Sequence, residues 1–300
     1  MTMAVFDRRA VRRHRDRAAA GFARHDFLLA EVAARLNDRL DDVKRTFHAA
    51  LDLGAHVGGL RDLVAARPGM ELVVACEPSP AMTRELGGAA VAADEELLPF
   101  ADGAFDLVVS GLSLHWVNDL PGALVQIRRA LKPDGLFLAA MLGGNTLEEL
   151  RAALAEAEIA AEGGLSPRVS PFADVRDAGD LLQRAGFALP VVDSDTITVS
   201  YGDPAALMND LRGMGESNAV VGRRKTWTRR ATLEAAAERY REMFGDSAGR
   251  VPATFHVITL TAWAPHPSQQ KPLKPGSART RLAEALGTVE IPAGEKAKPR

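Results

Sequence analysis

Acidic and glycine residues cluster at the end of the first of several short apolar runs, which begins near residue 49. This run ends in Leu51-Asp52-Leu53-Gly54-Ala55-His56-Val57-Gly58. Glycine lets the backbone approach a ligand closely, and the N–H groups at the start of a following helix are free to bind one. Asp52, Gly54, His56 and Gly58 are therefore the first candidates to contact a small charged ligand.

Two more acidic positions extend this candidate site. Glu77 ends the second run, about where an acidic residue accepts hydrogen bonds from ribose hydroxyls, and Asp94 and Glu95 follow the third run, where they could accept one from an adenine amine. One acidic residue at a strand end is most often a solvated cap. Three successive strand ends that face one crevice favour a ligand instead.

The glycine spacing separates two classes of cofactor. A dinucleotide-binding turn reads G-x-G-x-x-G, and the third position of that pattern holds His56 here. A nicotinamide or flavin site is therefore disfavoured, and a dehydrogenase is the minor alternative. His56 itself either contacts the cofactor or is a solvent-facing turn residue.

The elements around these residues predict a doubly wound α/β fold. Five apolar runs alternate with helical patterns, which is typical of a parallel sheet with crossover helices, and ligands of such sheets bind at the carboxyl ends of the strands. The predicted strands are residues 49–53, 71–76, 89–93, 105–110 and 135–141, and the predicted helices between them are residues 60–67, 80–86 and 121–131.

The second half of the chain predicts two more strands and a helical insert. Residues 195–201 and 254–263 are β-prone and are interpreted as an antiparallel edge, which makes a mostly parallel, seven-stranded sheet. Helices are expected at residues 146–161, 174–185, 204–213 and 229–244. We expect a helical segment over 1–45, one domain over 46–264 with a lid at about 143–251, and a loose tail over 265–300.

Composition and charge exclude several classes of protein. The net charge of −2 gives no reason to expect a nucleic-acid partner, and no apolar run approaches the roughly 20 residues that span a bilayer. The lone Cys76 cannot form an internal disulfide, and the cytoplasm fits such a chain best. Seven arginines in the first 25 residues could suggest a transit peptide or a membrane-surface helix. A solvated helix is favoured instead, because an apolar stripe follows at helical spacing and would dock it on a core: Leu29, Val32, Ala33, Leu36 and Leu40.

No metal site is expected. Cysteine and histidine are too sparse for structural zinc, and the one H-x-D pattern, His14-Arg15-Asp16, lies in an arginine-rich helical stretch rather than on a strand.

The segment over about residues 45–145 resembles the class I S-adenosylmethionine-dependent methyltransferases. Their first motif is similar to residues 51–58, and their later elements are similar to residues 94–100 and 105–116. The resemblance implies a Rossmann-like fold and S-adenosylmethionine as the cofactor. Glycine is usual in that family where His56 stands here.

A narrower resemblance covers nearly the whole chain. Residues 113–120, 143–147, 170–172, 213–218 and 251–254 are similar to the arginine-hydroxylase assembly factor of respiratory complex I and its bacterial relatives. A more distant similarity is to the malonyl carrier-protein methyltransferase of biotin synthesis. These resemblances imply a protein or carrier-protein substrate, such as a complex I subunit. A non-catalytic assembly factor that binds the cofactor as a structural ligand is the rival hypothesis.

Candidate substrate residues follow from the place where this fold presents the methyl group. His115 could act as a base, Trp116 and Asn118 lie in the same loop, and Asn145 follows the fifth strand nearby. Trp116 and His115 could equally pack against the lid without a chemical role. Glu216 and Asn218, within a glycine-punctuated stretch before the basic residues 223–225, are interpreted as a substrate loop rather than a plain connector.

Overall fold

The computed structural model describes residues 4–270, 276–277 and 279–289 of the chain. It forms two compact units, Met1–Pro265 and His266–Arg300. The first unit holds the sheet and all of the candidate site residues. In the second, one short helix, α10 (Leu282–Ala285), lies within the described residues. The predicted loose tail falls partly on residues 271–275, 278 and 290–300, which lie outside the described set.

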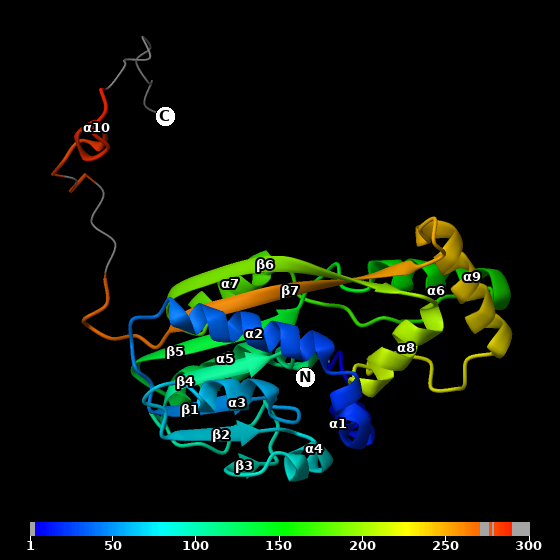
Figure 1. Cartoon of the computed structure of the whole chain (residues 1–300), viewed down its shortest axis with the longest axis horizontal. Coiled ribbons are helices and arrows are strands. Elements are labelled where there is room, and N and C mark those ends of the chain that lie inside the picture. The colour runs from blue at the N-terminus through cyan, green and yellow to red at the C-terminus, as the bar shows by residue number, and fades with distance from the viewer. Residues whose placement is uncertain (1–3, 271–275, 278, 290–300) are drawn as a thin grey trace. The chain divides into compact units, whose positions relative to one another are not determined.

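The first unit is built on a seven-stranded sheet, as predicted (Figure 1). The strands are β1 (Ala49–Leu53), β2 (Leu72–Cys76), β3 (Ala90–Val91), β4 (Phe105–Gly111), β5 (Leu131–Leu142), β6 (Ala188–Tyr201) and β7 (Val251–Trp263), in the spatial order β3-β2-β1-β4-β5-β7-β6. β1 to β5 are parallel to one another, and β7 is antiparallel to both β5 and β6. The order reverses between β1 and β4, and crevices at such switch points bind ligands.

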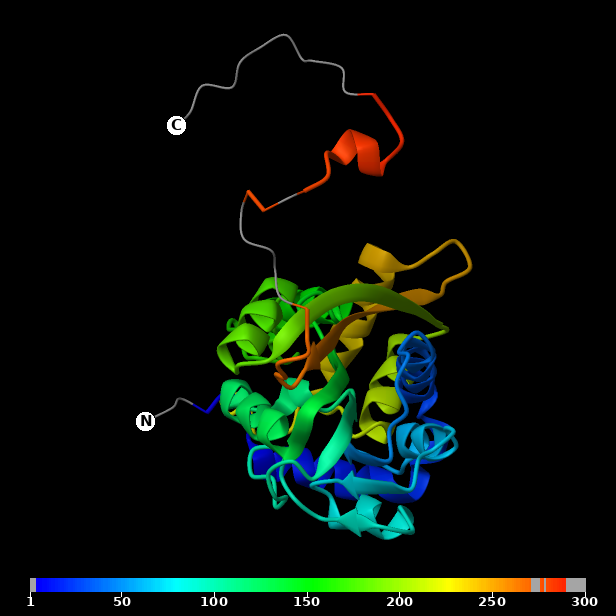
Figure 2. The same ribbon diagram turned by 90° about the vertical axis from the view of Figure 1, so that its left-hand side faces the viewer.

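Helices cover both faces of this sheet (Figure 2). α2 (Phe27–Asp41) and α3 (Gly59–Ala65) lie on one face, and α5 (Leu120–Ala130) and α7 (Val175–Arg184) lie on the other. The remaining helices are α1 (Arg8–Ala18), the 3₁₀ turns η1 (Ala19–Arg24) and η2 (Leu114–Trp116), α4 (Pro80–Glu85), α6 (Glu148–Glu162), α8 (Pro204–Gly213) and α9 (Arg230–Phe244).

The central strands are apolar on both faces because helices cover both. In β5, Leu136, Leu138 and Ala140 pack with the α2 and α3 side, whereas Phe137 and Met141 pack with α5 and α7. Successive strand residues point to opposite faces, so one apolar run supplies two cores. The unbroken apolar run of β5 therefore indicates a strand in the interior of the sheet.

Two differences from the sequence prediction matter for the site. α1 is not a solvated helix, because Ala10, Val11, Arg15 and Ala18 are buried against the rest of the unit. The predicted lid range also includes α7 and β6, which belong to the sheet and its covering layer. α6, α8 and α9 are the helices that gather at one end of the sheet, with α1 beside α8 (Figure 1).

Within the described residues, no helix is both long and apolar enough to cross a membrane.

Replacing Phe137 by alanine tests the core on the α5 and α7 side. Phe137 is fully buried and its ring stacks on Phe187 at a centroid distance of 5.4 Å. We expect Phe137→Ala to lower the free energy of unfolding by about 3–5 kcal/mol in a denaturant titration. Val191→Ala, at an exposed position of the edge strand β6, should lower it by less than about 1 kcal/mol. Equal losses would contradict this placement of the core.

Candidate functional site

The turn after β1 packs closely against the segment that follows β4. Gly54 has a φ of +71°, and a Cβ added there would lie 2.1 Å from the side chain of Ser113, which follows β4. Gly58 caps the N-terminus of α3 with a φ of +99°. Glycine is therefore required at Gly54 by both conformation and space, and the turn lies where the sequence predicted a ligand.

Asp52 is a buried carboxylate in this turn region. It is 1 % exposed, and neither of its oxygens has a hydrogen-bond partner among the described residues. Burial away from water raises the pKa of Asp52 to about 7. A buried carboxylate left unpaired is costly, so this position is suited to a polar or cationic group that is supplied from outside the chain.

Glu77, at the end of β2, is held by backbone and side-chain donors together. Its carboxylate accepts hydrogen bonds from the backbone N–H groups of His56 and Ser79, at 3.0 and 2.9 Å. Arg15 of α1 donates to it at 3.0 Å, and both side chains are fully buried. The predicted acidic residue is therefore in the crevice, fixed in place by the turn after β1.

Asp94 and Glu95 lie at the same edge, after β3, and share a second arginine of α1. Arg8 donates to Asp94 at 2.7 Å and also to Glu95. Although partial burial disfavours its charged form, Asp94 has a lowered pKa because Arg8 donates to it and attracts its charge. The three acidic positions that the sequence predicted at successive strand ends are thus brought together.

The sequence patterns did not identify Arg8, Arg15 or Ser113 as residues of the site. Arg15 donates to Ser113 Oγ at 2.9 Å, and Ser113 in turn donates to Glu95. Arg8 and Arg15 are seven residues apart, as are two positions on one face of a helix, and Ala10, Val11 and Ala18 are buried beside them. This weak apolar stripe was the available signal, but five other arginines in the first 25 residues obscured it.

His56 is buried, which corrects the alternative that it faces solvent. It adopts a φ of +51°, its residue exposure is 3 %, and its ring lies 5.5 Å from that of Phe22. Burial, and then the nearby charge of Arg15, lower the pKa of His56 far below the usual range. The imidazole is therefore neutral, and it lines the cavity described next.

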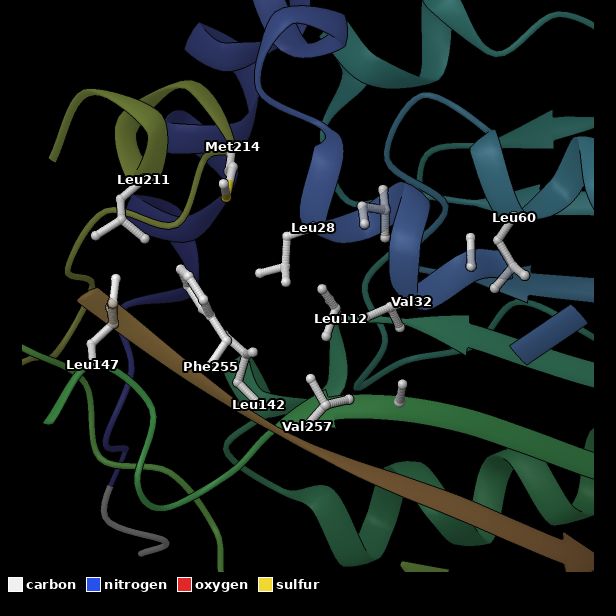
Figure 3. Packing of buried hydrophobic residues seen from close by; sticks show 14 of the residues in the cluster. Leu28, Val32, Leu60, Leu112, Leu142, Leu147, Leu211, Met214, Phe255 and Val257 are labelled. Carbon is white, nitrogen blue, oxygen red and sulfur yellow. The ribbon is translucent and has the colours of Figure 1, made fainter. Parts of the chain in front are cut away.

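A cavity of about 470 Å³ adjoins the turn after β1. Figure 3 shows Leu28, Leu147, Leu211, Met214 and Phe255 around this space. They come from α2, the turn before α6, α8 and its C-terminal turn, and β7, so the cavity lies between the sheet and the covering helices. Its polar lining includes His56, Trp116, Glu216, Ser217, Asn218, Arg168 and Arg212. Ligand sites of enzymes are commonly apolar with a few polar groups.

Glu216 is the acidic residue held inside this cavity. His115 Nε2 and Trp116 Nε1 each lie 3.0 Å from one of its oxygens. Burial works against its charged form, but the charge and hydrogen bond of His115 and the charge of Arg15 lower the pKa of Glu216. The loop after β4 and the loop after α8, which are about 100 residues apart in sequence, therefore build one polar site.

The other residues predicted to face a substrate do not lie together in the cavity. Asn218 lines the cavity but uses its side chain to hold its own loop, through Pro167 O and Val220 N. Asn118 accepts hydrogen bonds from the backbone N–H groups of Val5 and Phe6. Asn118, Asn145 and His115 are not among the described residues that line the cavity, and Asn145 is exposed. Asn118 thus anchors the segment before α1.

The H-x-D pattern and the basic run have internal partners. His14 contacts Ser217 O, and Asp16 accepts hydrogen bonds from Ser79 and Ala81. Arg223 pairs with Asp7, and Arg224 pairs with Glu162. Within the described residues, no group of three histidine, cysteine or acidic side chains is arranged to hold a metal ion.

Known proteins resemble this chain in sequence and in fold. Residues 51–139 match a family model described as a methyltransferase domain. The chain is 45 % identical to the mitochondrial arginine-hydroxylase NDUFAF5 of Danio rerio, over 94 % of this chain and 89 % of that protein. It is 35 % identical to the malonyl-[acyl-carrier protein] O-methyltransferase of Methylovorus sp. (strain MP688), over 96 % of this chain and 95 % of that one.

A solved structure agrees with the fold. The phosphoethanolamine N-methyltransferase 2 of Haemonchus contortus, solved with S-adenosylhomocysteine, superposes with a TM-score of 0.53 at 15 % identity, over 85 % of this chain and 60 % of that one. At this identity the similarity shows the fold alone. Together with the sequence matches, it confirms the expected class I methyltransferase relationship.

Replacing Asp52 by asparagine tests whether the carboxylate of Asp52 is unpaired in the folded chain. Because burial raises the folded-state pKa of Asp52 from 3.8 to about 7, the folded chain binds this proton more tightly than the unfolded chain does. The contribution of this proton to the free energy of unfolding is fully present below pH 4, and it is lost as the pH rises to 7. The stability of Asp52→Asn relative to the wild type should therefore rise between pH 4 and 7, by a few kcal/mol at most, roughly the linkage equivalent of that pKa shift.

Chemical denaturation at each pH gives this difference. Asp102→Asn, which changes an exposed carboxylate in the turn before β4, is the control and should show little pH dependence. A difference between Asp52→Asn and the wild type that stays constant from pH 4 to 7 would show that Asp52 is paired.

Proposed function

This chain belongs to the family that includes the arginine-hydroxylase NDUFAF5 and the malonyl-[acyl-carrier protein] O-methyltransferases, and from that premise we propose that it is an S-adenosylmethionine-binding enzyme that modifies an arginine side chain of a protein. The observation that carries the substrate assignment is the ionised Glu216 inside an apolar cavity. The cofactor assignment rests on the acidic crevice beside Gly54.

The residues of the crevice fit the cofactor. In this proposal Glu77, which is held by the backbone N–H of His56, accepts hydrogen bonds from the ribose hydroxyls, and Asp94, which pairs with Arg8, accepts one from the adenine amine. Asp52 has two unpaired oxygens for the amino-acid end of the cofactor. When bound, S-adenosylmethionine supplies a methyl group on a sulfonium centre.

Glu216 gives the cavity its preference for a cation. Carboxylates bind guanidinium groups through two parallel hydrogen bonds, and such a pair is stronger where water is excluded. His115 and Trp116 fix Glu216 by contacting its oxygens, so they are positioning residues in this proposal. His56, which is neutral, adds no charge that would repel a cationic substrate.

Two reactions are consistent with this site. Methyl transfer needs the cofactor and a positioned nucleophile, and positioning supplies much of the rate gain. Hydroxylation inserts one oxygen atom and needs an oxidant and two electrons from outside the chain, and it is the reaction named for the relatives at about 45 % identity. We propose hydroxylation as the first candidate.

One observation favours methylation of a malonyl carrier as the second candidate. Arg212 lines the same cavity, and its side chain has no hydrogen-bond or ion-pair partner among the described residues, so it could bind a carboxylate. The proposed partner is accordingly a protein that carries an arginine, such as a respiratory complex I subunit, or an acyl carrier protein. The cytoplasm remains the proposed location, whereas the NDUFAF5 relatives are named as mitochondrial.

Cofactor binding is the first test. S-adenosylmethionine should bind in calorimetry and raise the melting temperature, since a ligand at 100 times its Kd stabilises the folded state by about 2.7 kcal/mol. Glu77→Ala and Asp94→Ala should each weaken binding at least about tenfold, because each removes a charged acceptor. Asp102→Ala should bind as the wild type does. Binding of nicotinamide dinucleotide in place of S-adenosylmethionine would overturn the cofactor assignment.

The mass of the product decides the chemistry. Complex I subunits and acyl carrier protein from cells with and without this chain should be compared by mass spectrometry. We expect one added oxygen on an arginine, which Glu216→Gln abolishes. One added methyl on a malonyl group would establish the second candidate. No mass change, with the cofactor bound, would favour the non-catalytic assembly factor.

Substituting Glu216 should separate turnover from cofactor binding. We expect Glu216→Gln to lower product formation at least about 100-fold and to leave the Kd for S-adenosylmethionine within about threefold, because Glu216 lies in the substrate cavity. Glu234→Gln, which changes an exposed carboxylate of α9, is the control and should retain turnover. If Glu216→Gln lost the cofactor as severely as Asp94→Ala, Glu216 would belong to the cofactor site.

A further inference from the structure

A further hollow, of about 460 Å³, lies between η1 and α8, where α1 packs beside α8 (Figure 1). Three arginines line it, and we call it the arginine hollow: Arg17 near the end of α1, Arg24 in η1 and Arg212 in α8. The ring of His25 lines it as well, and no acidic side chain of the described residues does. The arginine hollow is therefore a positively charged site beside the substrate cavity.

The guanidinium groups of these three arginines are unpaired. Within residues 4–270, 276–277 and 279–289, none of them has a hydrogen-bond or ion-pair partner. Other arginines near the surface, such as Arg39 and Arg223, each pair with an aspartate. Like charges around one hollow repel one another, and a guanidinium binds a carboxylate through two parallel hydrogen bonds. An anionic group in the arginine hollow would therefore be bound favourably.

The wall of the arginine hollow is held in place by close packing. His25 Nδ1 lies 2.7 Å from Asp210 Oδ1 of α8, and a Cβ added to Gly213 would lie 2.2 Å from the His25 ring. Arg24 folds back over Gly21 in a similar way, so that a Cβ added there would lie 3.0 Å from its guanidinium. Glycine at these two positions thus leaves the space that the two lining side chains occupy.

The arginine hollow adjoins the cavity that contains Glu216. His25 and Arg212 line both spaces, and Arg212 precedes Glu216 by four residues. Asp26 also lines the cavity, but within the described residues it makes no ion pair with Arg212. A substrate guanidinium that pairs with Glu216 must therefore share this space with the positive charge of Arg212. Because like charges repel, an anionic group that the substrate brings to Arg212 would strengthen its binding.

We propose that the arginine hollow binds a carboxylate of the protein substrate, so that the enzyme selects an arginine that has an acidic residue near it. The inference rests on the proposed function, since it takes an arginine as the group that enters the cavity. The recognised feature is then a pair of opposite charges, with the guanidinium at Glu216 and the carboxylate at Arg212. Aspartate and glutamate are the anions that an unmodified protein carries on its side chains.

Peptide binding tests this selection without turnover. Calorimetry with S-adenosylhomocysteine present should compare short peptides that carry one arginine and one aspartate, at increasing separations, with peptides in which asparagine replaces the aspartate. The best aspartate peptide should bind the wild type about 10- to 30-fold more tightly than its asparagine counterpart, as expected for a charge-assisted contact. In the double variant Arg17→Gln/Arg24→Gln this preference should fall to within about threefold.

Arg212→Gln should act on both peptides. It removes a partner of the carboxylate and also a like charge beside the guanidinium, so the aspartate peptide should bind more weakly and the asparagine peptide more tightly than they bind the wild type. A role of Arg212 in folding alone would weaken the binding of both peptides. That result would contradict the inference.

A matched control removes the same charge from the same part of the chain. Arg9→Gln/Arg12→Gln changes two exposed arginines of α1 outside the arginine hollow and should keep the wild-type preference. Equal binding of the two peptide sets by the wild type, an unchanged preference in Arg17→Gln/Arg24→Gln, or the same loss in the control would each overturn the inference. Failure of every arginine peptide to bind the wild type, or binding that Glu216→Gln leaves unchanged, would instead overturn the proposed function.

Discussion

The buried contact of Arg15 with Glu77 and Ser113 holds together the parts of this molecule that meet at the crevice. It joins α1 to the ends of β2 and β4, and Ser113 extends it to Glu95 after β3. Burying an arginine and two carboxylates carries a large desolvation penalty, which only close pairing offsets. Removing one member would leave an uncompensated charge inside, so the position of α1 and the shape of the crevice depend on each other.

The cavity of about 470 Å³ depends on a different long-range arrangement. β7 returns antiparallel between β5 and β6, which carries Phe255 and the helices α8 and α9 to the end of the sheet where the crevice opens. Glu216, in the turn after α8, then meets His115 and Trp116 after β4. The insert therefore contributes polar chemistry as well as apolar walls, and α1 contacts it beside the crevice through His14.

The two halves of the site differ in how they are built. The strand-end cluster consists of backbone turns and carboxylates on rigid strand ends, which hold polar groups in fixed positions. The cavity is formed mainly by leucine, methionine and phenylalanine side chains from helices and loops, with one fixed carboxylate.

The sequence by itself determined the sheet and its strand-end acids. Alternating apolar runs, Gly54 and the carboxylates of Asp52, Glu77 and Asp94 are local patterns, and a parallel sheet brings strand ends to one edge whatever the rest of the chain does. Only the tertiary structure decided the roles of Arg15, Asn118 and Glu216. Their partners lie about 60 to 110 residues away, and no local pattern records which buried charge will pair with which across that distance. The burial of His56 was likewise undetermined, because it depends on Phe22 packing over a turn that the sequence alone leaves open to solvent.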